Sequence, residues 1–113
     1  MSKISDEKKG YWEDLNNWED IQELFEVDVD HPHEVILAIL ERDGDYEESI
    51  FIMYRNHNRY SIVHGYHCSC AGFEGQWDPE EYTKEEFKKC ALKFEYLHGE
   101  GKKYLEEYIK NMK

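Results

Sequence analysis

Three apolar runs separated by short turns constrain the fold of this chain more than any other feature. The runs cover residues 35–41, 50–55 and 60–68, with an Asp-Gly turn after the first and the Asn-rich segment 56–59 after the second. The third run alternates along its length, which is the period of a strand. Helix propensity would also allow a helix over residues 34–40, but the turn and the second run behind it favour a strand. The sequence therefore predicts a three-stranded antiparallel sheet.

A helix is predicted before this sheet. Apolar side chains in residues 11–27 recur close to helical spacing, and acidic side chains occupy the other positions. Asn17 is followed three residues later by Asp20, a pattern typical of an N-cap, which gives Trp18 as an alternative start of the helix. Residues 1–10 are polar and end in a glycine, so we expect a flexible tail there.

Two further helices are predicted after the sheet. The segment Thr83-Lys-Glu-Glu86 has the form of a capping box, and the apolar stripe behind it indicates a helix that ends at Gly99. A last amphipathic helix is predicted over residues 104–112. The expected fold is thus α+β, with residues 11–113 forming a single domain that has an acidic N-terminal helix, a three-stranded antiparallel sheet and two C-terminal helices.

The chain carries one distinctive motif. From His67 to Glu81 it reads HCSCAGFEGQWDPEE in one-letter code. This run resembles a family of small, mostly uncharacterised bacteriophage and prophage proteins, which carry a pattern like H-C-S-C-Y-G-L/F-E-G/D-Q-W-x-P-E-E at the end of a small sheet, after an acidic, aromatic-rich half. The likeness is specific over residues 67–81 and extends in layout over 18–83. Ala71 departs from it, because an aromatic residue is usual there, and so does the additional C-terminal helical stretch.

The resemblance implies a phage origin and a small protein that acts in the cytoplasm of an infected bacterium. It implies no particular activity. The odd count of three cysteines, without an apolar N-terminal segment of a secretory signal, also favours a reducing cytosolic setting. No apolar run approaches the roughly 20 residues that a membrane-spanning helix needs, so we expect no membrane contact.

Cys68 and Cys70 are candidate metal ligands. They stand two residues apart, so on a strand both would face the same side and could reach one zinc ion. His64, Cys90 and His98 are candidates to complete the site. A module of the form C-x-C…C-x-H is excluded, because Leu92 stands two residues after Cys90. We expect ordinary buried thiols, with a zinc-binding adaptor built on Cys68 and Cys70 as the alternative.

Acidic residues gather in one third of the chain. The net charge is −12, and residues 11–48 hold 14 Asp and Glu against Arg42 alone. Such a surface disfavours direct nucleic-acid binding, which needs Lys and Arg, and complements a basic partner. The predicted partner-binding residues are Glu13, Asp20, Glu23, Glu26, Asp28, Asp30, Asp43, Asp45, Glu47 and Glu48.

Motifs of catalysis are absent from the sequence. It has no phosphate-binding Gly-Lys-Ser/Thr loop, no dinucleotide fingerprint and no nucleophile elbow. A small hydrolase would require a concave pocket lined by His64 or His67. We therefore predict a non-enzymatic phage protein that inhibits or redirects a host protein through its acidic surface. Its target would be a nucleic-acid-handling protein, such as RNA polymerase, a nucleoid protein or a defence nuclease, and the acids would mimic nucleic acid.

Overall fold

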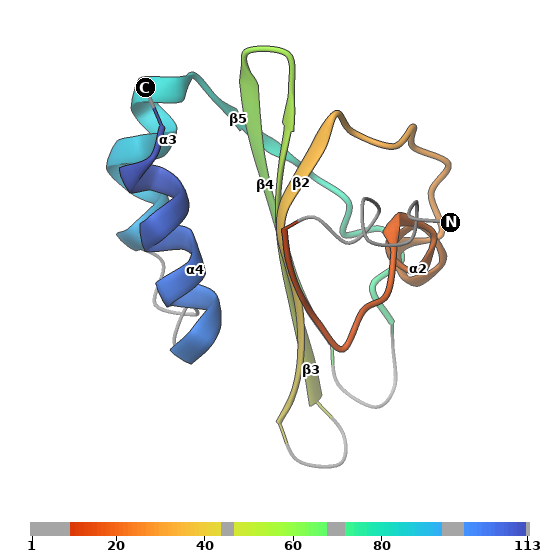
Figure 1. Cartoon of the computed structure of the whole chain (residues 1–113). Helices are drawn as coiled ribbons and strands as arrows, with labels where there is room; N and C mark the ends of the chain where they lie inside the picture. The colour runs from red at the N-terminus through yellow and green to blue at the C-terminus, as the bar shows by residue number, and fades with distance from the viewer. Residues whose placement is uncertain (1–9, 44–46, 68–71, 94–98, 113) are drawn as a thin grey trace, which may run out of the picture.

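In this computed structural model, one β-sheet lies between helices on both of its faces. The structure describes residues 10–43, 47–67, 72–93 and 99–112. Its elements in chain order are β1 (Tyr11–Glu13), α2 (Trp18–Phe25), β2 (Glu34–Asp43), β3 (Glu47–Asn56), β4 (Arg59–His67), β5 (Glu80–Tyr82), α3 (Lys84–Cys90), the 3-10 turn η1 (Ala91–Lys93) and α4 (Gly99–Lys110). Figure 1 shows the sheet nearly edge-on, with α2 on one side and α3 and α4 on the other. No helix in these described stretches is long and apolar enough to span a membrane.

The sheet has five strands in the order β1-β2-β3-β4-β5. β1 runs parallel to β2, and every other neighbouring pair is antiparallel. The prediction of a three-stranded antiparallel sheet is therefore wrong, although the three predicted strands form its centre. The sequence does not reveal β1 and β5 because each has only three residues, too few to show alternation. Tyr11 and Trp12 of β1 also fit the helical spacing of the residues that follow.

The helix boundaries follow their capping residues. α2 begins at Trp18, and the Asn17 side chain accepts a hydrogen bond from the Asp20 backbone at 2.9 Å, so the alternative start is confirmed and the start at Tyr11 is wrong. The capping box at the start of α3 is also confirmed. Gly99 does not end that helix. It begins α4 with a φ of +64°, a conformation that glycine adopts without steric cost.

Each face of the sheet has its own apolar core. Ile21 and Phe25 of α2 are buried against one face. Phe87 of α3 and Leu105 of α4 are buried against the other. Because both faces are covered, the central strands are apolar on consecutive positions over much of their length. Residues 1–9 of the predicted tail lie outside the described residues.

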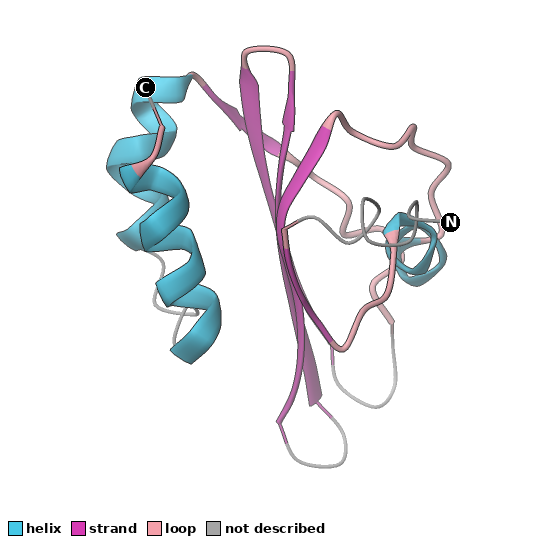
Figure 2. Cartoon of the chain, in the orientation of Figure 1, coloured by secondary structure: helices cyan, strands magenta, loops and turns pink. Residues whose placement is uncertain are grey.

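A loop closes the free edge of β4. β5 pairs only with the first part of β4, up to Ile62. Beyond it, the Tyr66 backbone N–H donates to Gln76 Oε1 and Gln76 Nε2 donates to the Tyr66 carbonyl oxygen, both at 2.9 Å. Gly65 leaves room for this arrangement, because a Cβ there would lie 2.8 Å from Gln76 Oε1. Residues 72–79 therefore form a loop that is hydrogen-bonded to the edge of β4, on the α2 side of the sheet in Figure 2.

Candidate functional site

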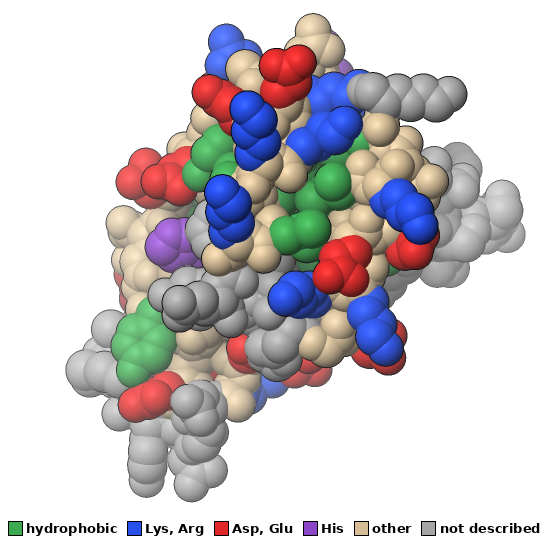
Figure 3. All heavy atoms as spheres, turned by 90° about the vertical axis from the view of Figure 1, so that its left-hand side faces the viewer, with side chains coloured by type: hydrophobic (Ala, Val, Ile, Leu, Met, Phe, Trp, Pro, Cys, Tyr) green, Lys and Arg blue, Asp and Glu red, His purple; other side chains and the backbone are tan. Residues whose placement is uncertain are grey.

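The most unusual surface of the molecule is the acidic layer formed by α2 and the segments that connect it to β1 and β2. Residues 11–33 contain no Lys or Arg. The layer on the α3 and α4 side differs, because the described residues 80–93 and 99–112 contain seven acids and seven bases. Figure 3 shows lysines and acids intermixed on that side. The acidic layer consists of Asp14, Glu19, Asp20, Glu23, Glu26, Asp28 and Asp30, whereas Glu13 lies on the opposite face with Tyr11.

α2 presents its acids because its other side is buried. Trp18, Ile21 and Phe25 recur at helical spacing and face the sheet, which leaves Glu19 and Glu23 exposed. Two of these acids also suit the helix electrostatically: Glu19 and Asp20 lie in the first turn, where the helix dipole favours negative charge.

The connector behind α2 is bonded back to the helix. Trp18 Nε1 and Gln22 Nε2 both donate to the carbonyl oxygen of Val29, each at 2.8 Å. This double contact holds the segment beside the helix while Asp28 and Asp30 remain exposed. Between helix and connector lies a hollow of about 440 Å³, lined in part by acidic side chains, namely Glu19, Asp28 and Asp30.

The predicted partner-binding acids divide into two groups. Some hold the fold together: Asp20 accepts the Asn16 N–H at 2.8 Å, and Glu13 accepts the Tyr11 hydroxyl at 2.7 Å. Glu48 does so too, with Arg42 and His67 each 2.8 Å from its carboxylate. The second group is exposed and forms no ion pair within the described residues. It comprises Glu23, Glu26, Asp28, Asp30 and Glu47.

The structure does not bring all ten predicted acids to one face. Glu47 and Glu48 are consecutive on β3, so their side chains point to opposite faces of the sheet. Asp43 pairs with Glu47 through the backbone, and Asp45 lies outside the described residues. Glu19, which was not among the predicted contacts, lines the hollow beside α2. Its place on the exposed face of α2, two residues after the N-cap Asn17, is a signal that the sequence already contains.

The metal prediction rests on residues outside the described part of the chain, namely Cys68 and Cys70, with His98 as a further candidate. Among the described residues, no group of three His, Cys, Asp or Glu side chains could hold a metal ion. Cys90 is half-buried on α3, and burial raises the pKa of its thiol, which keeps it protonated at neutral pH.

The two histidines of the motif region lie on opposite faces of β4. His67 contacts the ring of Phe73 in the α2-side core, with centroids 4.5 Å apart, and its Nε2 lies 2.8 Å from Glu48. His64 is three residues earlier and stands across from Phe51 on the other face. They therefore point away from each other and cannot serve as two ligands of one ion; His64 lines a cavity.

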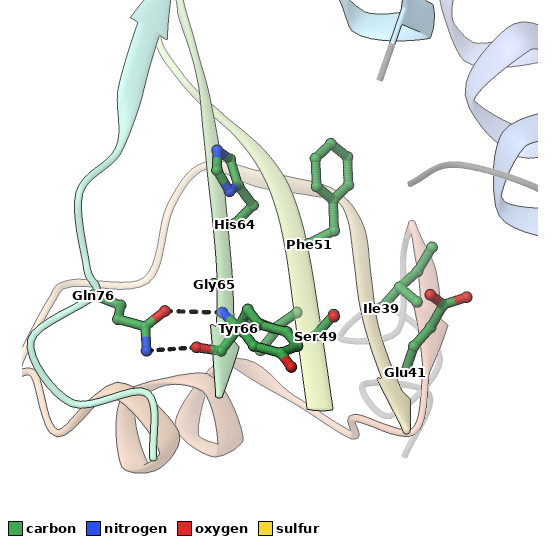
Figure 4. Close-up of a pocket in the computed structure, with 9 residues that line it drawn as sticks. Ile39, Glu41, Ser49, Phe51, His64, Gly65, Tyr66 and Gln76 are labelled. Carbon is green, nitrogen blue, oxygen red and sulfur yellow. Dashed lines mark hydrogen bonds between the residues drawn. The ribbon is translucent and has the colours of Figure 1, made fainter. Parts of the chain in front are cut away.

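That cavity lies on the sheet face opposite α2. Its volume is about 370 Å³, and Ile39, Ser49, Phe51, His64 and Tyr66 are among its lining residues (Figure 4). A hydrolase of the serine type would need Ser49 hydrogen-bonded to the imidazole of His64. The concave pocket that this alternative requires is present, and both Ser49 and His64 line it.

Comparison of the chain with protein-family models, with curated proteins and with solved structures found no match. The resemblance to phage proteins thus stays a prediction from the motif. The candidate site has to be judged from its own residues, and the concentration of unpaired carboxylates around α2 is its main chemical property.

Proposed function

We propose that this protein is a non-enzymatic binding protein whose acidic layer contacts a basic surface on a partner protein. The observation that carries the proposal is the charge separation. Residues 11–33 place seven carboxylates on the α2 side and supply no Lys or Arg, although Arg42 of β2 lies 3.6 Å from one of them, Asp14; the α3 and α4 side is balanced. Repulsion between these carboxylates opposes folding. A partner with a basic surface would neutralise the carboxylates, so the same charges would favour binding.

The acidic layer also has a shape that suits binding to a partner. The hollow beside α2 lets acids approach a partner from both sides, and its connector is held by two hydrogen bonds rather than left loose. A preformed surface loses little entropy when it binds. Its carboxylates would steer a basic partner by long-range attraction, which weakens as salt screens the charges.

The partner we propose is a host bacterial protein that handles nucleic acid. The resemblance to phage proteins supports a bacterial host as the source of the partner. The charge supports a nucleic-acid-handling partner, because carboxylates spread over a folded surface can occupy a site built for phosphates. The protein would then inhibit or redirect its host target in the cytoplasm by taking the place of DNA or RNA.

The test is competitive capture from a bacterial lysate. The purified protein, immobilised through its C-terminus, should retain a basic host protein, and duplex DNA or RNA should displace that protein. Retention should fall steeply as salt rises. If neither DNA nor RNA displaces any retained host protein, nucleic-acid mimicry is wrong, whereas binding through another surface would persist at high salt.

A further inference from the structure

Two histidines from distant parts of the chain meet at one end of the sheet. His33 ends the connector that follows α2, and His57 lies in the tight turn between β3 and β4. The strand register brings them together, because Glu34, the residue after His33, pairs with Arg55 of β3. The two imidazole rings lie edge to face, with their centroids 4.2 Å apart.

The contact requires that the imidazole of His33 is neutral. The backbone N–H of His57 donates a hydrogen bond to Nδ1 of His33 at 3.2 Å. A ring nitrogen that accepts a hydrogen bond carries no proton, so His33 is in the neutral form with its proton on Nε2. Protonation at Nδ1 replaces this acceptor by a second donor, which cannot bond the N–H of His57.

His31, in the same connector, has the opposite requirement. Its Nδ1 lies 2.7 Å from the carbonyl oxygen of Pro32, which can only accept a hydrogen bond. That nitrogen therefore carries a proton in the neutral ring and in the charged ring alike, so acidification leaves the contact intact. Of these two histidines of the connector, only His33 makes a contact that depends on its protonation state.

The turn residue His57 occupies a conformation that needs support. Its φ is +55°, in the left-handed region, which is less favourable for a residue with a side chain than for glycine. Two hydrogen bonds hold its backbone: the N–H donates to His33, and the carbonyl oxygen accepts from Nη1 of Arg55 at 2.9 Å. Loss of the first bond removes one of the two contacts that maintain this conformation.

Other charged and titratable groups surround the turn. The hollow that His57 lines is shared by Arg55, Arg59, Tyr60, Lys84 and Glu85. Two carboxylates face this group as ion-pair partners of its arginines, namely Glu34 for Arg55 and Glu81 for Arg59. Among these types of side chain, histidine is the one that changes its charge between about pH 5 and 8. The histidines therefore determine the pH response at this end of the sheet.

We propose that His33 is a pH-sensitive latch between the connector and the β3–β4 turn. While its ring is neutral, it holds His57 in the left-handed conformation. Protonation breaks the bond, and repulsion between the two charged rings separates them. The turn then relaxes, which reshapes the hollow of about 630 Å³ between the turn and the start of α3. The latch goes beyond the proposed function and does not depend on partner binding by the acidic layer.

NMR of the histidine rings tests both states of the latch. At about pH 7.5, the ring nitrogens should show a proton on Nε2 of His33 and on Nδ1 of His31, and nuclear Overhauser effects should connect the rings of His33 and His57. At about pH 5, these effects between the two rings should be lost. Circular dichroism should stay unchanged over the same range, because only the latch opens.

Substitutions separate the titration of His33 from that of His57 itself. His57→Asn removes the second titrating ring, and Asn tolerates the left-handed conformation. In this variant the backbone amide resonance of residue 57 should still shift as His33 titrates. The further change His33→Ala should abolish that shift, whereas His31→Ala, the matched control, should preserve it.

Four results would overturn the latch. They are a proton on Nδ1 of His33 at neutral pH, a ring contact with His57 that persists at about pH 5, equal effects of His33→Ala and His31→Ala, and loss of the circular dichroism signal together with the ring contact. The last result would show that acid unfolds the whole chain instead of opening one contact. Capture of a partner by the acidic layer is measured separately, so the two proposals fail independently.

Discussion

The side-chain amide of Gln76 forms with the backbone of Tyr66 the two hydrogen bonds that a neighbouring strand would form. Both are 2.9 Å long, one donated by the Tyr66 N–H and one accepted by its carbonyl oxygen. Gln76 Nε2 also lies 3.2 Å from the carbonyl oxygen of Gly72. An exposed strand edge invites pairing with other chains, and here one side chain blocks it at the mouth of the cavity.

Replacement of Gln76 by Ala should therefore destabilise the protein by about 2 kcal/mol, because the N–H and carbonyl oxygen of Tyr66 and the carbonyl oxygen of Gly72 each lose a hydrogen bond. Gln22→Ala is the matched control: that amide donates only one hydrogen bond, to Val29, and should cost about 1 kcal/mol. Urea unfolding of both variants measures the difference. An equal or larger loss for Gln22→Ala would contradict the role assigned to Gln76.

Gly101 marks the closest approach of α4 to the sheet. A Cβ at Gly101 would lie 2.7 Å from Cδ1 of Ile39. Gly101→Ala should lower the free energy of unfolding despite the better helix propensity of Ala. Ile39→Val removes the obstructing Cδ1. In that background, Gly101→Ala should raise the free energy of unfolding by up to about 1 kcal/mol. A double-mutant cycle tests this, and additive effects of the two changes would disprove the contact.

Glu26 ends α2 in a left-handed conformation, with a φ of +56°. Glycine adopts this conformation without steric cost, so Glu26→Gly should raise stability by about 1 kcal/mol. Glu19→Gly removes the same charge from inside the helix, where glycine is unfavourable, and should lower stability by about 1 kcal/mol. Thermal unfolding measures the stability of both variants. If both substitutions raise stability, or both lower it, the loss of charge rather than the backbone conformation determines the effect.

Stability should fall at alkaline pH. The hydrogen bond to Glu13 raises the pKa of Tyr11 to about 12, and burial together with Glu80 raises that of Tyr82 to about 12. Both tyrosines titrate near 10.0 when unfolded, so the unfolded chain loses these protons first. Their contribution is complete below pH 10 and is lost as the pH rises towards 12.

The double variant Tyr11→Phe and Tyr82→Phe should show a shallower loss of stability over that pH window. Urea unfolding at several pH values provides the measurement. Some loss remains, because burial also raises the pKa of Tyr54 and Tyr104. Identical pH profiles for the wild type and the double variant would exclude the two hydrogen-bonded tyrosines as the source.

Charge reversal distinguishes the contribution of the acidic layer to partner binding from that of the other acids. Glu19→Lys, Glu23→Lys and Asp28→Lys together should abolish capture of the basic partner, because these exposed residues support no described ion pair. Asp20 is left unchanged, since it accepts the Asn16 N–H. Capture from lysate, with circular dichroism as a check on folding, measures the effect.

The control for that experiment is reversal of acids on the balanced side of the sheet. Glu85 and Glu106 are exposed on α3 and α4. Their replacement by Lys should leave capture nearly unchanged. If both sets of reversals weaken capture alike, net charge rather than the acidic layer determines binding.

Local patterns in the sequence predicted the central elements and their caps. Alternation and turn residues predict the three central strands, and Asn17 and Thr83 mark the starts of α2 and α3 because a cap is a contact between near neighbours. Gly99 was misinterpreted as a helix end, since the same φ suits the residue that opens α4.

The sequence by itself determined which residues are apolar, which carry charge and where helices start. Only the tertiary structure decided the rest, because it depends on contacts between distant segments. The parallel pairing of β1 with β2 is one such contact, and the sorting of the acids into structural and exposed groups is another. The cavity beside Ser49 is a third: it arises where three strands place Glu41, Ser49 and Tyr66 in one row, and no spacing within the chain reveals that alignment.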